Sequence, residues 1–510
     1  MARFVISHRI AGKRSQAERD ASLAAWHDAQ AHVRKFADIV HRNKPLAGRR
    51  GVLFIDSDPR EINAKRRDAH ADLIVEPQVE RTTARYLPFR ALGLQRVNAD
   101  SGATGIGAAL ELTIKSAAGP VSGVAVNVAM SNARTGASTV LTTNTDANGL
   151  AAFTYDASVW VPATAIVHPH GGVWSWTQLY PKDGMTIQLA DLPRSGPMGW
   201  WHSLLGMTKY TEQRGSGIRV GVVDTGAGPH PYLGQVQAAG AFLNGAANDA
   251  AGATNDVADH GTHVAGIIAA RPAAGSQDFG GIAAGADVFA ARVYPGGGPA
   301  GDEGTANNGD IAAAIDALSS AHQVDLMNLS LGGAQPSEIE MDAVSAAIEA
   351  GVLLICAAGN GNGAPVIYPA AYPGAVAVSA IGLNGTFPAG SVDALSMPQQ
   401  ADHFAANGIY AASFNNIGPA VVCTGPGVAI ISTVPSADGQ PAYGAMSGTS
   451  MASPVVCASL AAVLSEDAQY RKLPRDASRA QYAWTVLARG LRPLGLNSQY
   501  QGYGMASTAP

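Results

Sequence analysis

Cysteine and charged residues are scarce in this sequence. Of its 510 residues only three are cysteine, and 14% are Asp, Glu, Lys or Arg. The cysteines, Cys356, Cys423 and Cys457, lie in apolar runs and show no metal-ligand spacing. We therefore expect buried free thiols, and neither a disulfide scaffold nor a metal centre built on them. The net charge of −5 provides no basic surface, which argues against nucleic-acid and membrane-surface partners.

Export and membrane signals are missing as well. The chain begins MARFVISHRIAGKR, which holds no apolar segment of signal-peptide length. No stretch has the ~18 uninterrupted apolar residues that a membrane helix requires. The sequence therefore predicts a soluble chain, in the cytoplasm or exported by a route that needs no such signal, and gives no compartment.

The length predicts two to four domains, because one core rarely organises a chain of this size. Residues 1–88 show strand runs at 3–8, 51–56 and 73–77, an amphipathic helical pattern over 15–40, and a second helix that begins at Asp58. This pattern predicts a small α+β domain with three strands.

Two further regions precede the main part of the chain. Residues 89–106 have the composition of a linker. From 107 to 195, short alternating runs are separated by Gly, Asn, Asp and Pro, with a tight turn expected at 146–149. This spacing predicts an immunoglobulin-like β-sandwich, which we interpret as a structural or binding module.

Residues 196–510 alternate near-continuous apolar runs with helical patterns. Such runs are typical of strands that are covered on both faces. The region therefore predicts an α/β domain with a doubly wound parallel sheet, with active residues at the carboxyl ends of its strands.

Two polar residues follow such strands. Asp224 comes after the apolar run RVGVV, where a carboxylate needs partners, although a turn or cap role is equally open for it alone. Asn360 follows VLLICAAG and is a candidate donor to an oxyanion, or otherwise the first residue of an Asn-Gly turn.

A histidine and a serine stand at the mouths of apolar helices. His260 precedes the helical run in DHGTHVAG, whereas His263 lies one turn further in and is expected in the core. In SGTSMASP, Pro454 is tolerated only near a helix start, which places Ser450 at the helix mouth. Ser447 falls outside the helix and Ser453 inside its first turn.

The motifs VVDTG, HGTHVAG, NLSLGG, AAGN, TGPGV and SGTSMASP occur in this order, and over about residues 198–510 the chain resembles the subtilisin family of serine proteases. The resemblance implies that Ser450 attacks the peptide carbonyl and that His260 transfers its proton. It further implies that Asp224 orients His260, and that Asn360 and the Ser450 backbone N–H bind the oxyanion.

The resemblance also implies where substrate binds. Ser330, Leu331, Gly332 and Gly333 would offer a strand edge to an extended peptide. Three small residues would line the pocket for the residue before the cut, namely Ala357, Ala358 and Gly359. The loop 294–309 would form the opposite wall; its acidic residues, Asp302 and Glu303, would favour a basic side chain, although a solvated loop is the favoured interpretation.

Three departures from the family pattern stand out. The segment 271–281 differs from the usual calcium-binding loop and has few assignable ligands, so we predict no cofactor and assign no calcium site. Val455 and Ala458 replace the usual His and Gly after the serine, which a buried helix accommodates. The spacing between His260 and Ser450 is longer than in small members, with an insertion near 386–409.

The N-terminal region resembles the subtilisin propeptide, with three predicted strands where the family has four. This implies an intramolecular inhibitor, a cut near residues 82–87, a sandwich that stays attached, and a second processing zone at 191–199. We therefore expect a self-processing serine endopeptidase acting on protein or peptide substrates. The alternatives are a dedicated intracellular processing protease for one partner, and a non-catalytic binding protein that works through its sandwich.

Overall fold

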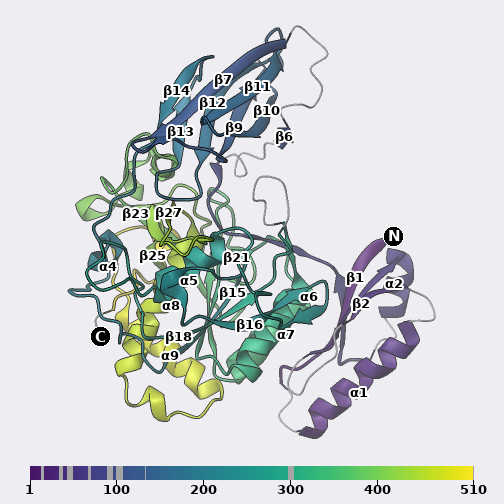
Figure 1. Ribbon diagram of the computed structural model, residues 1–510. Helices are drawn as coiled ribbons and strands as arrows, with labels where there is room; N and C mark the ends of the chain where they lie inside the picture. The colour runs from purple at the N-terminus through teal and green to yellow at the C-terminus, as the bar shows by residue number, and fades with distance from the viewer. Residues whose placement is uncertain are drawn as a thin grey trace.

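The computed structural model describes residues 1–12, 16–33, 38–42, 50–66, 70–88, 96–98, 107–132, 134–296 and 304–508. Figure 1 shows an N-terminal α+β body beside a large α/β body, with a β-sandwich above the latter. The predicted linker 89–106 lies outside the described residues except for β6 (Arg96–Asn98). This strand pairs in parallel with β10 (Ser138–Asn144), so part of the predicted linker belongs to the sandwich.

The N-terminal body contains one antiparallel sheet of four strands in the order β2-β3-β1-β4. Its elements are β1 (Ala2–His8), α1 (Gln16–Val33), β2 (Asp38–Arg42), β3 (Val52–Ser57), α2 (Pro59–Arg66) and β4 (Leu73–Pro77). The helix predicted over 15–40 is therefore wrong at its end, and the three-strand prediction is one strand short. Pairing of the β-branched Ile39 with Ile55 on β3 outweighs the helical periodicity there.

The sandwich consists of two sheets, β13-β12-β9-β10-β6 and β11-β7-β14, with β8 at the edge of β7. Its further strands are β7 (Gly107–Ser116), β8 (Gly119–Pro120), β9 (Ala125–Ser131), β11 (Leu150–Asp156), β12 (Val161–His168), β13 (Trp176–Leu179) and β14 (Met185–Gln188). Leu112, Phe153 and Ile187 from one sheet meet Val128 and Val167 from the other in a single core. The turn at 146–149 forms as predicted, with Gly149 at φ +74°.

The large body has a sheet in the order β17-β16-β18-β15-β20-β22-β23-β24, with β25 also on β23. All pairs are parallel except those of β17 and β24. Its strands are β15 (Arg219–Asp224), β16 (Gln237–Leu243), β17 (Ala246–Asn248), β18 (Asp287–Arg292), β20 (Leu326–Leu329), β22 (Leu353–Ala357), β23 (Val376–Leu383), β24 (Ile409–Ala411) and β25 (Cys423–Pro426). This is the doubly wound α/β sheet that the sequence predicts.

Helices cover both faces of this sheet. The helices are α4 (Trp200–Leu204), α5 (His260–Ala269), α6 (Asn308–Asp316), α7 (Glu338–Glu349), α8 (Thr449–Glu466), α9 (Ala477–Gly490) and α10 (Ser498–Gln501). α5 and α8 contribute to one apolar core, and α6 and α7 to the other. Side-chain caps explain where two helices begin, because Asn307 and Ser337 accept hydrogen bonds from the N–H groups of Asp310 and Glu340.

Helix α8 forms the centre of the body. It is the one helix of the described residues that is long and apolar enough to cross a membrane, but 89% of it is buried. Pro454 is its sixth residue, further in than the first turn expected from the sequence. Proline removes one helical N–H, and the Ser450 carbonyl that would have accepted it instead accepts from Ser330 Oγ at 2.8 Å. The three cysteines are buried and unpaired, as predicted.

The N-terminal sheet packs its apolar face on α6 and α7. Buried charges cross this interface: the Arg50 guanidinium, fully buried, contacts Asp316 at 2.8 Å and Asp342 at 3.0 Å. The Glu76 carboxylate accepts hydrogen bonds at the start of α7, from Ser337 Oγ and the Glu338 N–H. Because a buried ion without its partner is costly, these pairs fix the orientation of the sheet.

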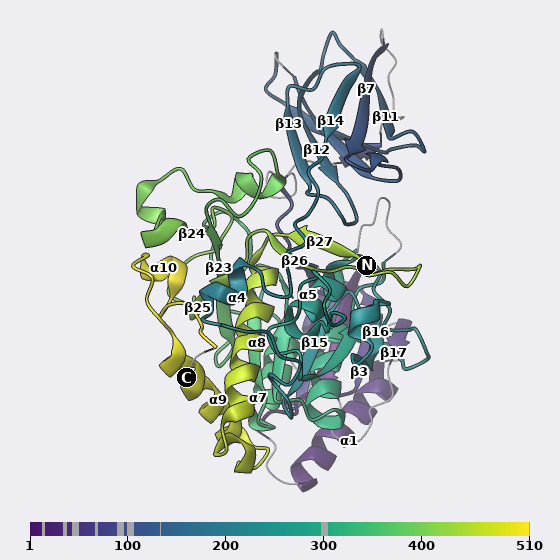
Figure 2. The ribbon, with the colours of Figure 1, turned by 60° about the vertical axis from the view of Figure 1, so that its left-hand side comes forward.

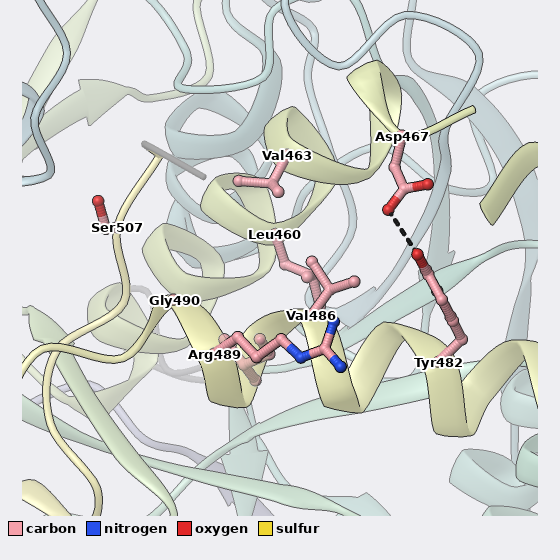
Figure 3. A pocket seen from close by; sticks show the side chains of 9 residues that line it. Leu460, Val463, Asp467, Tyr482, Val486, Arg489, Gly490 and Ser507 are labelled. Atoms are coloured by element: carbon pink, nitrogen blue, oxygen red, sulfur yellow. Dashed lines mark hydrogen bonds between the residues drawn. The ribbon is translucent and has the colours of Figure 1, made fainter. Parts of the chain in front are cut away.

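A small cavity of about 210 Å³ lies between the C-terminal half of α8 and α9. Figure 3 shows its lining, with the Tyr482 hydroxyl donating to Asp467 at 3.0 Å. Because Leu460 and Val463 line it, the cavity lies well along α8 from the SGTSMASP motif at the helix start.

Candidate active site

Asp224 and His260 meet at one edge of the sheet. Asp224 is the last residue of β15 and His260 the first of α5, and Asp224 Oδ1 lies 2.6 Å from His260 Nδ1. Both side chains are at most 1% exposed. The end of β15 and the start of α5 therefore converge, which the implied role of Asp224 requires. His263 lies in the core, where its Nε2 contacts the Ile430 carbonyl at 3.0 Å.

Asp259 directly precedes His260, but its carboxylate contacts a different histidine. Its backbone is in the left-handed region, at φ 68°, and its carboxylate lies 3.1 Å from Nδ1 of His170, which belongs to the sandwich. The hydrogen bond with Asp259 raises the pKa of His170, and partial desolvation opposes that rise.

A part-buried carboxylate that the sequence analysis missed connects these segments. Asp256 accepts hydrogen bonds from Thr225 Oγ1, beside Asp224, and from the Thr262 N–H, in the first turn of α5. Burial raises the pKa of Asp256 to about 6, against these hydrogen bonds. An acidic residue four positions before His260 at a helix start was the available signal.

Ser450 is the second residue of α8, directly after Gly448 and Thr449. Its hydroxyl is buried and donates to the Ser330 carbonyl at 2.8 Å. Ser453 lies inside the helix as predicted, and its buried Oγ lies 3.0 Å from Ser330 Oγ. Ser447 lies outside the helix, and its Oγ donates to Asp393 at 2.5 Å.

Asn360 and Ser450 both donate hydrogen bonds to one backbone carbonyl oxygen of the same chain, that of Ala84. The side-chain Oδ1 of Asn360 accepts hydrogen bonds from the Thr449 N–H and hydroxyl at 3.0 Å each. These bonds turn the side-chain nitrogen of Asn360 toward the N-terminal segment. That nitrogen donates to the Ala84 carbonyl. The Ser450 N–H donates to the same oxygen at 3.1 Å.

The segment before Ala84 forms the middle of a three-stranded sheet. β5 (Glu80–Thr83) pairs antiparallel with β21 (Leu331–Gly332) on one side and β19 (Ala306–Asn307) on the other. The Ala84 N–H donates to the Ser330 carbonyl at 3.0 Å, which continues the pairing. β21, from the predicted strand edge, and β19, from the end of the predicted opposite wall, therefore lie on the two sides of the extended β5.

The other predicted binding residues lie nearby. Gly333 is hydrogen-bonded to Tyr368 in both directions. Ala357, Ala358 and Gly359 are buried at the end of β22, and the Gly359 N–H donates to Thr449 Oγ1 at 3.1 Å. Asp302 and Glu303 lie outside the described residues.

Residues after Ala84 contact a part of the site that the sequence analysis did not identify. The Tyr86 N–H donates to the Ser447 carbonyl at 2.8 Å, and the Tyr86 ring stacks on Phe414 with centroids 4.7 Å apart. Gly448, at φ +148°, permits this approach, because a Cβ there would lie 2.4 Å from the Ala84 oxygen. A hollow of about 400 Å³ is lined by Asn362, which is two positions after Asn360 in the sequence, and by Leu395 and Met397.

The segment 271–281 contains one buried acid, Asp278. Its carboxylate is bonded to Arg194 at 3.0 Å and to the Tyr232 hydroxyl at 2.9 Å. Among the described residues, no group of three or more His, Cys, Asp or Glu side chains has the arrangement of a metal site. The sequence prediction of no assignable calcium site stays a prediction.

Known proteins match this architecture. The Subtilase family model matches residues 215–504. Subtilisin Savinase of Lederbergia lenta is 32% identical over 253 residues, which are 49% of this chain and 77% of the relative. Minor extracellular protease Epr of Bacillus subtilis is 34% identical over 256 residues, 50% of this chain and 33% of its own length.

A solved structure resembles the fold of nearly the whole chain. Fervidolysin from Fervidobacterium pennivorans, described as a keratinolytic enzyme related to subtilisin, superposes with a TM-score of 0.55 at 19% identity. The match covers 99% of this chain and 60% of fervidolysin. That likeness concerns the fold, whereas the family match over more than half of the chain and the identity with Subtilisin Savinase show that the chain belongs to the subtilase family of subtilisin-like serine proteases.

Proposed function

We propose that this chain is a serine endopeptidase made as an autoinhibited precursor, and that the peptide bond between Ala84 and Arg85 is its first substrate. The observation that carries the proposal is the Ala84 carbonyl oxygen, which accepts from both the Ser450 N–H and the Asn360 amide. Two fixed donors on the carbonyl oxygen, beside a serine hydroxyl, are what acyl transfer at a peptide bond requires.

The chemical roles follow from this geometry. Ser450 Oγ breaks its hydrogen bond to the Ser330 carbonyl and gives its proton to His260. It then forms a covalent bond to the Ala84 carbonyl carbon. Asp224, 2.6 Å from His260 Nδ1, holds the ring and stabilises its charged form. The negative oxygen is stabilised by Asn360 and the Ser450 N–H.

Collapse of this intermediate breaks the bond to the Arg85 nitrogen, which takes the proton from His260. The Ala84 carbonyl remains bound to Ser450 Oγ as an ester until water, activated by His260, releases it. Substrates in general would bind as β5 does, along the main chain of residues 330–333. Ala357, Ala358 and Gly359 would line the pocket for the residue before the cut.

The N-terminal body would act as the inhibitor of the same site. Its sheet is anchored on α6 and α7 by Arg50 and Glu76, and Arg81 adds a fully buried ion pair with Glu340 at 2.7 Å. These contacts hold β5 in the cleft. After the cut, the fragment ending at Ala84 would keep the same contacts and block the site until it is removed.

The test is the mass and N-terminal sequence of the purified full chain beside its Ser450→Ala variant. We expect the wild type to give one fragment that ends at Ala84 and another that begins at Arg85, and the variant to stay intact. Ser459→Ala, which lies in the same helix and bonds only to its own turn, should process like the wild type. A wild type that stays whole and resists a serine-directed phosphonate would refute the proteolytic function.

Breadth of action is tested separately. A general endopeptidase would degrade an unfolded protein such as casein once the N-terminal fragment is removed. A dedicated processing protease would leave casein intact and cleave only one partner, and a binding protein would keep its role in the Ser450→Ala variant.

A further inference from the structure

The β-sandwich reaches the active site through two contacts. In the first, the start of β13 pairs with the insertion near 386–409: the Val392 N–H donates to Ser175 at 3.0 Å, and the Thr177 N–H donates to Gly390 at 2.9 Å. The Val392 side chain is 6% exposed and packs among sandwich residues, namely Ala129, Val140 and Ile166.

In the second contact, the β12–β13 connection lies on the hairpin of β26 (Ile430–Thr433) and β27 (Tyr443–Met446). The Gly172 N–H donates to the Tyr443 carbonyl at 2.8 Å. Figure 2 shows this hairpin directly beneath the sandwich. The sandwich therefore contacts the large body at two places, the insertion near 386–409 and the β26–β27 hairpin.

Each contact presents a side chain to the leaving-group side of the cleft. Next to Val392 is Asp393, which is 4% exposed and accepts from Ser447 Oγ; the Ser447 carbonyl in turn accepts from the Tyr86 N–H. Two residues before Gly172 is His170, which contacts Asp259 at 3.1 Å directly before His260.

Arg85 connects these groups electrostatically. Burial raises the pKa of Asp393, and its hydrogen bonds and the Arg85 charge oppose that rise. Asp259 raises the pKa of His170, against partial desolvation and the same Arg85 charge. The main chain places Arg85 in this part of the cleft, because the Ala84 carbonyl before it accepts from the Ser450 N–H and the Tyr86 N–H after it donates to the Ser447 carbonyl.

We propose that the sandwich and the insertion together form the subsite for the residue directly after the cut, and that this subsite selects a basic side chain through Asp393 and Asp259, tuned by His170. The inference rests on the proposed proteolysis and adds the substrate class. The desolvated Asp393 gains a counter-charge when a cation binds, whereas an acidic residue there would meet two carboxylates.

The experiment uses the self-processed chain after its N-terminal fragment has been removed, and quenched fluorescent peptides that carry residues 80–88 of this sequence. Position 85 is Arg, Lys, Ala or Glu, and kcat/KM is measured for each. We expect Arg and Lys to exceed Ala by about tenfold, as for a charged group in a buried site, and Glu to be the poorest.

Two variants test the assignment of the groups. His170→Glu should raise the Arg-to-Ala ratio about 2- to 5-fold, since it replaces a partly positive group by a negative one at an exposed position. Asp393→Asn should lower the ratio. Because the ratio compares two substrates on one enzyme, a general loss of activity in Asp393→Asn does not affect it. Lys182→Glu, an equally exposed change elsewhere in the sandwich, should leave the ratio unchanged.

The outcomes separate the two proposals. If no peptide is cleaved and Ser450 is not labelled, the proposed proteolysis fails. If all four peptides are cleaved equally, or if the ratio stays constant in both His170→Glu and Asp393→Asn, proteolysis stands and the subsite assignment is overturned.

Discussion

The carbonyl oxygen of Ala84 lies 3.1 Å from the backbone nitrogen of Ser450, although the two residues are far apart in the sequence. The contact belongs to a continuous set, since the Ala84 N–H also donates to Ser330 and the Tyr86 N–H donates to Ser447. Main-chain bonds on both sides of one peptide bond leave it no freedom to slide. The chain therefore presents a single peptide bond to Ser450.

Asn360→Ala should slow the appearance of the fragment ending at Ala84 by about 10²–10³-fold, the loss known for this amide in subtilisin itself. The fold should survive, because the amide is only part-buried. The rate is followed by mass spectrometry after refolding. Unchanged processing would exclude Asn360 from oxyanion binding.

Arg50→Ala should destabilise the precursor strongly. It leaves Asp316 and Asp342 buried without their cation, and such a loss typically costs about 3–5 kcal/mol. The measurement is denaturant unfolding of the Ser450→Ala precursor with and without the change. The matched control is Arg3→Ala, whose pair with Asp56 is 36–37% exposed and should be worth under about 1 kcal/mol. Equal effects would mean that the buried cluster does not anchor the N-terminal body.

The large body and its polar site residues could be predicted because their signals are local. Each of Asp224, His260, Asn360 and Ser450 directly follows or opens an apolar run, and the chain order of those runs sets the sheet. The cut predicted near residues 82–87 includes the Ala84–Arg85 bond, which lies over Ser450. A sequence pattern, however, cannot choose among adjacent peptide bonds. That choice depends on the β5 register, in which Thr83 faces Leu331.

Contacts between modules could not be predicted. His170 and Asp259 are 89 positions apart, and nothing in either segment signals the other. Asp393 lies in an insertion whose excess length was visible but whose docking face was not. Strand β2 was missed for a different reason: its residues continue a helical pattern, and only the neighbouring β3 makes them a strand.

Gly390→Ala should loosen the sandwich from the large body. A Cβ at this position would lie 2.2 Å from the Trp176 indole, so the ring or the strand must move. We expect faster hydrogen exchange at the Thr177 amide, which donates to the Gly390 carbonyl. Gly490→Ala, where a Cβ meets nothing within 4 Å, is the control. Unaltered exchange at Thr177 would show that this contact does not hold the sandwich in place.

Acid should destabilise the precursor below about pH 6.5. Burial lowers the pKa of His202 and His263 to about 3 and that of His8 and His230 to about 4. The unfolded chain takes up these protons near 6.5, so the stability is complete above that pH and falls as the pH drops toward 4, by about 1.4 kcal/mol per unit for each histidine. Asp256, with a pKa of about 6, stabilises the folded chain as the pH falls from 6 to 4. This gain offsets the loss of stability from about one histidine.

The Tm of the Ser450→Ala precursor, measured from pH 8 to 5, should therefore fall with acidification. His202→Gln should reduce the dependence, because it removes one titrating group, while it lowers the Tm at pH 8 through the lost packing and the hydrogen bond to Gly280. A Tm that is flat across this range, or a slope that His202→Gln leaves intact, would contradict the assignment of these histidines as neutral in the folded chain.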